Sequence, residues 1–245
     1  MKTYTTLNIG HFHTNYCEDF WVTSPVTKNQ QLIAVTDGCT MGTESAFAAM
    51  LLGKILRQIA KELYYEDFRL PSPVPLDLKL EEILKRLFSR LKAIKNQLGL
   101  DTHEMLSTLV LGLVDEQSLQ AELIVIGDGL ICYDGNLLEF EQNDRPDYLA
   151  YHLGTDFGAW YQAQSQHVSI KDFRDLSIST DGIFSFKNFV SPSEQKKEEE
   201  IIDFLLVNVH LSEHNNFLER KMRFIRERWQ HEVTDDLAIV RMITS

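Results

Sequence analysis

Four Asp-Gly pairs are the first feature of this sequence that could do chemistry, and two of them end apolar strands. LIAVTDG (32–38) and LSISTDG (176–182) each run from an alternating apolar segment straight into the aspartate, and neither is followed at once by a returning strand. A carboxylate at a strand end is well placed to bind a cation, because the adjacent glycine lets the backbone approach closely. Asp37 and Asp181 are therefore candidate cation ligands.

The other two Asp-Gly pairs have a simpler explanation, because Asp-Gly is also the commonest hairpin-turn signal. In LICYDGNLLEF (130–140) the pair Asp134–Gly135 separates two short strands, which predicts a two-residue loop. The segment LIVIGDG (123–129) fits both explanations, a strand-end cation ligand and a hairpin turn. Asp128 ends a strand as Asp37 does, but a two-residue turn explains it equally well.

Two acidic pairs also lie near strand starts: Glu18–Asp19 in NYCEDFWV and Asp235–Asp236 in VTDDLAIV. Taken alone, such a pair is usually a solvated strand start. Taken with the Asp-Gly strand ends, these carboxylates come from distant segments that can converge at one edge of a two-sheet core. Hard cations such as Mg²⁺ and Mn²⁺ prefer oxygen ligands, and two of them roughly 3.5–4 Å apart can activate water and clamp a phosphoryl group.

The elements that must position these carboxylates follow from hydrophobic periodicity. Apolar residues at helical spacing predict a first helix that Thr43 or Ser45 caps, with Glu44 near its positive end, and three prolines within 65–76 indicate a loop. The order of elements predicts two antiparallel sheets packed face to face with helices outside, in one domain spanning 1–245. The predicted strands are 3–9, 19–23, 31–36, 107–115, 119–127, 130–133, 136–141, 165–170, 175–180 and 236–243, and the predicted helices are 43–63, 77–97 and a pair within 194–230 that is broken near 214–216.

Composition bounds the function classes. The 245 residues are 44% hydrophobic, enough for a large core, and carry a formal net charge of −12, which disfavours nucleic acid and anionic lipid as partners. The three cysteines show no zinc spacing and no disulfide framework, which points to a reducing compartment. The N-terminus lacks the apolar core of a signal peptide, and no apolar run reaches the roughly 20 residues of a membrane span. We therefore expect a cytoplasmic protein, with a monomer as the default.

Six segments stand in order along the sequence: CEDFWV, AVTDG, STLVLGLV, LIVIGDG, SISTDG and TDDLAIV. Each segment is a weak signal alone, but together they cover residues from about 8 to 243. In this order they resemble the motifs of the metal-dependent protein phosphatase 2C family, as in a divergent member of bacterial type. The resemblance implies an α+β fold, a four-layer α-β-β-α sandwich with helix pairs outside two antiparallel sheets.

The resemblance also implies roles for individual residues. It implies a protein-serine/threonine phosphatase in which a water that bridges two Mn²⁺ or Mg²⁺ ions attacks phosphoserine or phosphothreonine of a phosphoprotein directly. Asp37, with the carbonyl of Gly38, matches the ligand that bridges the two ions, and Asp181 and Asp235 match the other ligands. Asp19 matches the acidic pair that holds the centre through water, and Glu18 is its weaker partner. Asp128 falls where many members bind a third metal.

The sequence departs from the family at the residue that binds the substrate phosphate. The family often places an arginine four residues before its first acidic pair, and this chain has Thr14 there. His13, next to it, or His11 could replace the arginine weakly, because an imidazolium donates fewer hydrogen bonds. The simpler interpretation, that both histidines are ordinary strand residues, is slightly favoured. The segment CTMGTES (39–45) offers no general acid, and Asp128 is followed by Gly-Leu instead of the usual Ser-Arg.

Other function classes fit less well. Neither the G-x-S-x-G elbow of serine hydrolases nor the glycine-rich motifs of nucleotide-binding proteins occur. The basic run RKMRFIRER (220–228) is typical of an amphipathic helix with a solvated face. Two alternatives stay open. One is a phosphatase fold that survives as a catalytically weak regulatory or binding module, and the other is a phosphomonoesterase for small molecules.

Overall fold

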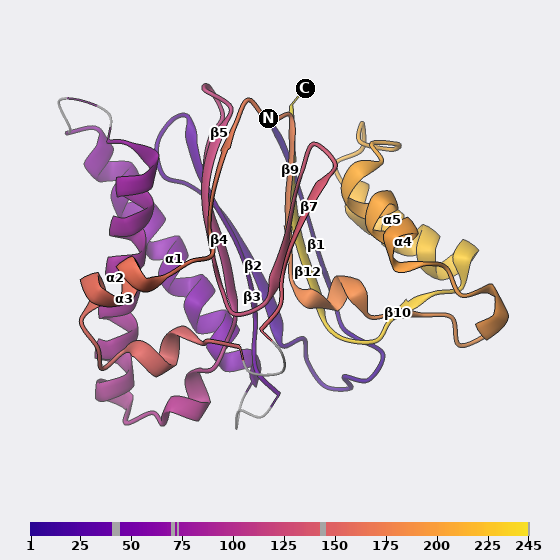
Figure 1. Ribbon diagram of the computed structural model, residues 1–245, viewed down its shortest axis with the longest axis horizontal. Helices are drawn as coiled ribbons and strands as arrows, with labels where there is room; N and C mark the ends of the chain where they lie inside the picture. Colours follow the sequence, from indigo (N-terminus) through magenta and orange to yellow (C-terminus); the bar gives the residue numbers. More distant parts are fainter. Residues whose placement is uncertain (41–44, 70–71, 73, 143–145, 245) are drawn as a thin grey trace.

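Two five-stranded antiparallel sheets form the centre of the protein (Figure 1). The computed structural model describes residues 1–40, 45–69, 72, 74–142 and 146–244. The first sheet has the order β1-β12-β9-β6-β7, and the second has the order β2-β3-β4-β5-β8. The strands are β1 (Lys2–Asn8), β2 (Asp19–Pro25), β3 (Gln30–Asp37), β4 (Leu109–Asp115), β5 (Gln120–Ile126), β6 (Gly129–Tyr133), β7 (Asn136–Phe140), β8 (His167–Lys171), β9 (Asp175–Ser179) and β12 (Leu237–Ile243).

Helices lie outside both sheets, as Figure 1 shows: α1, α2 and α3 on one side, and α4 and α5 on the other. Helix α2 ends at Gly99, whose φ of 68° is left-handed and suits glycine. A two-stranded ribbon of β10 (Phe186–Lys187) and β11 (Glu232–Val233) and several short 3₁₀ turns complete the described part. The helices are α1 (Ser45–Asp67), α2 (Leu76–Leu98), α3 (Phe157–Ala163), α4 (Glu198–Ile202), which continues as the π-helical turn η5 (Asp203–Val207), and α5 (Phe217–Phe224), which continues as η6 (Ile225–Trp229).

Three apolar clusters hold these elements together. One lies between the sheets and includes Ile33, Val110 and Val240. A second joins the β2-β3-β4-β5-β8 sheet to α1 and α2, and a third joins the other sheet to α4, η5 and α5. Strands β3, β4, β6 and β9 are buried along most of their length, because both of their faces are covered. None of the described helices combines the length and apolar character that a membrane span requires.

The predicted α+β class with two antiparallel sheets is confirmed, and every predicted strand is present within about two residues. The hairpin at Asp134–Gly135 is also confirmed, because both residues have positive φ, 47° and 80°, between β6 and β7. Three helical features differ from the prediction. Helix α1 runs four residues past the predicted end, the break in the C-terminal helical region spans 208–216, and α3 was not predicted. Thr43 and Glu44 lie outside the described residues, and the hydroxyl of Ser45 donates to the carboxylate of Glu18.

Candidate metal centre

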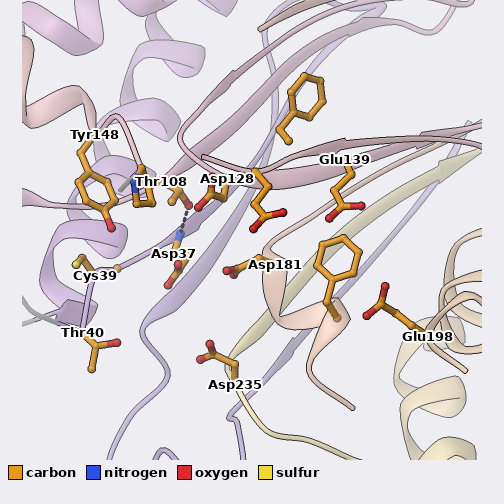
Figure 2. Close-up of a pocket in the computed structure, with 15 residues that line it drawn as sticks. Asp37, Cys39, Thr40, Thr108, Asp128, Glu139, Tyr148, Asp181, Glu198 and Asp235 are labelled. Carbon is orange, nitrogen blue, oxygen red and sulfur yellow. Dashed lines mark hydrogen bonds between the residues drawn. The ribbon is translucent and has the colours of Figure 1, made fainter. Parts of the chain in front are cut away.

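A cavity of about 570 Å³ lies where β3 ends and the turn after β9 begins (Figure 2). Figure 2 shows side chains from both sheets facing this space. Its lining includes no lysine, arginine or histidine among the described residues. Its acidic lining residues are Asp37, Asp128, Glu139, Glu141, Asp181, Glu198 and Asp235.

Asp37 and Gly38 form the corner of the cavity at the end of β3. The Asp37 amide donates to Oγ1 of Thr108 at 3.3 Å, and the Thr108 amide donates to the Asp37 carbonyl at 2.8 Å. An ideal Cβ on Gly38 would lie 2.0 Å from the carbonyl oxygen of Ser45, so only glycine fits. Burial, reinforced by the charges of Asp19 and Asp181, raises the pKa of Asp37 well above its usual range.

Asp19 lies directly behind Asp37, because the register of β2 and β3 pairs the two residues. Asp19 is buried, does not line the cavity, and accepts a 2.6 Å hydrogen bond from Oγ1 of Thr180. Burial raises the pKa of Asp19 to about 7, although its hydrogen bonds with Thr180 and Asp37 favour the charged form. Asp19 is therefore placed to act on the cavity through Asp37.

Glu18 is not among the residues that line the cavity. Its carboxylate accepts hydrogen bonds from Oγ1 of Thr40, at 3.2 Å, and from Oγ of Ser45, and its carbonyl accepts the Gly38 amide at 3.1 Å. These contacts anchor the residues on either side of the β3 corner. Glu18 thus supports the backbone around Asp37 rather than lining the space beside it.

Asp181, Asp235 and Asp128 line the cavity together with Asp37. Asp181 is the first residue of the 3₁₀ turn that follows β9. Asp235 lies two residues before β12 begins. Burial in the cavity wall, with the charges of Asp235 and Asp128, raises the pKa of Asp181 to about 6, although its side chain remains open to the cavity. The turn depends on Gly182, whose ideal Cβ would lie 1.8 Å from the carbonyl oxygen of Asp236.

His13 and Thr14, the candidates for binding the substrate phosphate, do not line the cavity. Thr14 is exposed. His13 lies between two carboxylates, with Nδ1 2.9 Å from Oδ2 of Asp236 and Nε2 3.4 Å from Oδ1 of Asp235. His11 instead pairs with Glu232, at 2.7 Å. Within CTMGTES, residues 41–44 lie outside the described residues.

Among the polar lining residues that the sequence did not single out are Glu139, Glu141, Glu198 and Tyr148. Burial and the charge of Glu139 raise the pKa of Glu198. Burial, with Cys39 and Asp37 nearby, raises the pKa of Tyr148. Nothing in the sequence marks these residues, because glutamates in a short exposed strand and at a helix start are ordinary surface residues.

The oxygen atoms that line the cavity are ligands of the kind that a hard divalent cation prefers. The lining groups are carboxylates and hydroxyls, and the mutual repulsion of the carboxylates is what a cation would relieve. Among the described residues, no three His, Cys, Asp or Glu side chains already converge as a complete ligand set. A cation would therefore have to draw these side chains together, with water completing its coordination.

Comparisons with known proteins point to one family. A family model described as Protein phosphatase 2C matches residues 10–233. Serine/threonine phosphatase Stp1 from Staphylococcus aureus has a similar fold, with a TM-score of 0.62 at 14% identity over 100% of this chain and 96% of that one. The SiaA-PP2C domain of Pseudomonas aeruginosa gives 0.59 at 14% identity over 99% and 86%.

A third similar structure holds the PP2C phosphatase domain and a regulatory fragment of SpoIIE from Bacillus subtilis. Its TM-score is 0.61 at 15% identity, over 99% of this chain but 63% of that one, so this chain spans less than two thirds of it. A comparison with curated protein sequences gives no match. At these identities the structural likeness establishes a shared fold, and the family model carries the sequence relationship.

Proposed function

We propose that this chain, which belongs to the protein phosphatase 2C family because the family model matches residues 10–233, is a metal-dependent protein-serine/threonine phosphatase. The relationship to bacterial members predicted from the sequence agrees with the structures it resembles. One of these is named a serine/threonine phosphatase, which supports phosphoserine and phosphothreonine in proteins as the substrate class.

One observation carries the proposal: carboxylates from three separate segments line one cavity, and no described basic residue lines it with them. Asp37, Asp181 and Asp235 sit at the ends of elements that pack for their own apolar reasons, so their meeting is not a by-product of one surface loop. Carboxylates with pKa values raised by burial and mutual repulsion are costly to keep charged. Such a cost is expected of a cation-binding site.

The residues have distinct tasks in the proposed mechanism. Asp37, the Gly38 carbonyl, Asp181 and Asp235 would hold two Mn²⁺ or Mg²⁺ ions, and Asp128 would help to hold a third. Bound divalent cations would supply Lewis-acid activation of water and of the phosphoryl group. Asp19 would influence the charge state of Asp37, because the two carboxylates interact across the β2–β3 pair.

Neutral donors are the groups that this chain offers to a phosphate oxygen within the cavity. Thr40, Thr108 and Tyr148 line it, and each carries a hydroxyl that is protonated at neutral pH and can donate. Since no described lysine, arginine or histidine lines the cavity, phosphate binding would depend on cations more than on side chains. We therefore expect weak substrate binding without metal.

The test is hydrolysis of p-nitrophenyl phosphate and of a phosphothreonine peptide, with Mn²⁺, with Mg²⁺ and with chelator. We expect activity that requires metal and that Asp37→Asn removes. Asp134→Asn is the matched control, because Asp134 also belongs to an Asp-Gly pair but lies in the β6–β7 turn and does not line the cavity. Its Oδ1 accepts the amides of Arg174 and Asp175, and the carbonyl oxygen of an asparagine can accept them as well. A wild-type protein without metal-dependent activity, or an Asp37→Asn variant as active as Asp134→Asn, would contradict the proposal.

A further inference from the structure

Asp236 is a buried carboxylate to which the proposed function assigns no role. Its side chain is 1% exposed. Oδ1 accepts the Gly10 amide at 2.7 Å, while Oδ2 accepts the Glu18 amide and lies 2.9 Å from Nδ1 of His13. These contacts join the segment before β2 to the segment before β12.

The turn at residues 10–13 is fixed against residues 233–235 by its backbone as well. Amides 11 and 12 donate to carbonyls 233 and 234, at 2.9 and 3.2 Å, and amide 13 closes the turn on carbonyl 10 at 2.9 Å. An ideal Cβ on Gly10 would lie 2.3 Å from the carbonyl carbon of Asp235, so the two backbones are in close contact. The turn is therefore a rigid support beside Asp235.

His13 lies at the end of this turn, and its Nε2 atom is directed toward Asp235. Nε2 lies 3.4 Å from Oδ1 of Asp235, whose side chain is 54% exposed, whereas that of His13 is 19% exposed. The same Oδ1 accepts the Asp236 amide at 2.8 Å. No hydrogen bond from the described part of the chain reaches Oδ2 of Asp235, which leaves that oxygen to a ligand.

We propose that His13 is a positioning residue of the metal centre: held by Asp236, it fixes the carboxylate of Asp235 so that Oδ2 can bind a divalent cation. This inference rests on the proposed function. An exposed aspartate samples several rotamers, and a ligand that is ordered beforehand loses less conformational entropy on binding. Removing an outer-shell partner of this kind lowers metal affinity by about 10–100-fold.

The geometry separates this role from a phosphate-binding one. Both ring nitrogens of His13 lie beside carboxylates, Nδ1 2.9 Å from Asp236 and Nε2 3.4 Å from Asp235, and His13 does not line the cavity. A positioning residue should affect the binding of metal. A phosphate-binding residue should affect the KM of the substrate with metal affinity unchanged.

The primary measurement is Mn²⁺ binding to the metal-free protein by isothermal titration calorimetry. We expect His13→Ala to raise the Kd for Mn²⁺ by about 10–100-fold. His11→Ala is the control, because His11 belongs to the same turn but pairs with Glu232. Its Kd should equal that of the wild type. Equal Kd values for the two variants would overturn the inference, while a wild type that binds no Mn²⁺ would overturn the proposed function itself.

Two conservative variants test which ring nitrogen matters and keep the inference testable if His13→Ala does not fold. The amide of His13→Asn can replace Nδ1 and hold Asp236, but it is too short to reach Asp235. The amide of His13→Gln can replace Nε2. We expect the glutamine variant to keep more Mn²⁺ affinity than the asparagine variant. The reverse order would overturn the inference.

The coupling to Asp235 is tested by a double-mutant cycle. If His13 acts through Asp235, then His13→Ala should lower Mn²⁺ affinity no further in an Asp235→Ala background. At saturating Mn²⁺ the single His13→Ala variant should recover the kcat and KM of the wild type for p-nitrophenyl phosphate. Additive losses in the cycle, or a raised KM at saturating metal, would overturn the positioning role.

Discussion

Asp37 is held at the cavity by its backbone, while its side chain lines the cavity and interacts with Asp19. Its amide and carbonyl both bond to Thr108, and the following residue, Gly38, packs against the start of α1 with no room for a side chain. The direction of the Asp37 side chain is therefore set by main-chain contacts. A residue placed in this way can keep its position whether or not a cation is bound.

The close contact at Gly38 predicts a specific loss of stability. A Cβ there would lie 2.0 Å from the carbonyl oxygen of Ser45, and that backbone atom cannot move without shifting α1. We expect Gly38→Ala to lower the free energy of unfolding by about 1–3 kcal/mol, the usual cost of overpacking. Urea unfolding of the metal-free protein measures it.

The control for this variant is Gly154→Ala, because an ideal Cβ on Gly154 meets no atom within 4 Å. Its unfolding midpoint should match that of the wild type. Equal midpoints for the Gly38 and Gly154 variants would show that the contact at the β3 corner is not as tight as described.

At the scale of elements, the β2–β3 register brings Asp19 against Asp37 and makes stability depend on pH. Folding raises the pKa of Asp19 to about 7 and that of Asp181 to about 6, above unfolded values of about 3.9. The folded state therefore favours the protonated carboxyl. The stability gained in this way is complete below about pH 4 and is lost as the pH rises toward 7.

We therefore expect the Tm of the metal-free protein to fall between pH 5 and pH 7, and saturating Mn²⁺ to remove that fall. Asp37→Asn should show a smaller fall, because it removes one of the repelling charges. The window ends at pH 7 because burial lowers the pKa of Lys221 to about 7, which makes its contribution rise with pH above that value. A metal-free Tm that increases from pH 5 to pH 7 in a calorimetric scan would contradict this account.

A second element-scale feature ties the C-terminal helices to their sheet. Arg241 on β12 is fully buried, with Nε and Nη2 bonded to the carboxylate of Asp175 at 2.9 and 2.5 Å. Its guanidinium also donates to the carbonyls of Leu205, Val207 and Asn208 at the end of η5. One side chain therefore satisfies the last carbonyls of a helix from within the sheet.

Arg241→Met should lower the free energy of unfolding by about 3–5 kcal/mol, because it leaves a carboxylate and three carbonyls without their donor. Arg220→Met is the matched control, since the side chain of the exposed Arg220 bonds, within the described part of the chain, only to Asn216 one turn away. We expect that variant to stay within about 0.5 kcal/mol of the wild type. Comparable losses in chemical denaturation would show that Arg241 does not carry the link between η5 and the sheet.

At the scale of the whole molecule, the acidic cavity predicts the charge of the preferred substrate. Metal ions would neutralise the aspartates, but Glu139, Glu141 and Glu198 would remain at the rim. We expect a phosphothreonine peptide flanked by arginines to have a kcat/KM at least about tenfold above that of the same peptide flanked by glutamates at low salt. Steady-state kinetics at two salt concentrations measures the ratio.

The double variant Glu139→Gln with Glu198→Gln should reduce this preference, whereas Glu213→Gln, on an exposed segment outside the cavity, should not. The ratio should also fall at high salt, because exposed charges are screened. An unchanged ratio in the double variant would show that the rim does not select the substrate.

Much of the fold could be predicted because alternating apolar strands and amphipathic helices leave strong local patterns. The strand-end aspartates were also visible, since Asp37 and Asp181 interrupt apolar runs where a turn alone is a poor explanation. The sequence did not indicate which of the carboxylates line the cavity and which are buried behind it. Whether Asp19 lines the cavity or lies behind it depends on the register of β2 against β3 and the packing of α1, which are tertiary properties.

The contacts of His13 could not be predicted for the same reason. Its neighbours Asp235 and Asp236 lie more than 200 residues away in sequence, and they meet only because the segment before β2 folds over the start of β12. The short helix α3 was missed because seven residues give too little periodicity to detect. Glutamates at the rim carry no local signal, since their importance comes from the aspartates that they face.

The proposed function depends most on divalent cations in the cavity, and anomalous diffraction from crystals grown with Mn²⁺ is the direct test of their presence. We predict anomalous difference peaks within the cavity, in contact with Asp37, Asp181 and Asp235, and a weaker density in crystals of the Asp37→Asn variant. Crystals with Mn²⁺ at millimolar concentration and no anomalous peak among these three carboxylates would contradict the central claim.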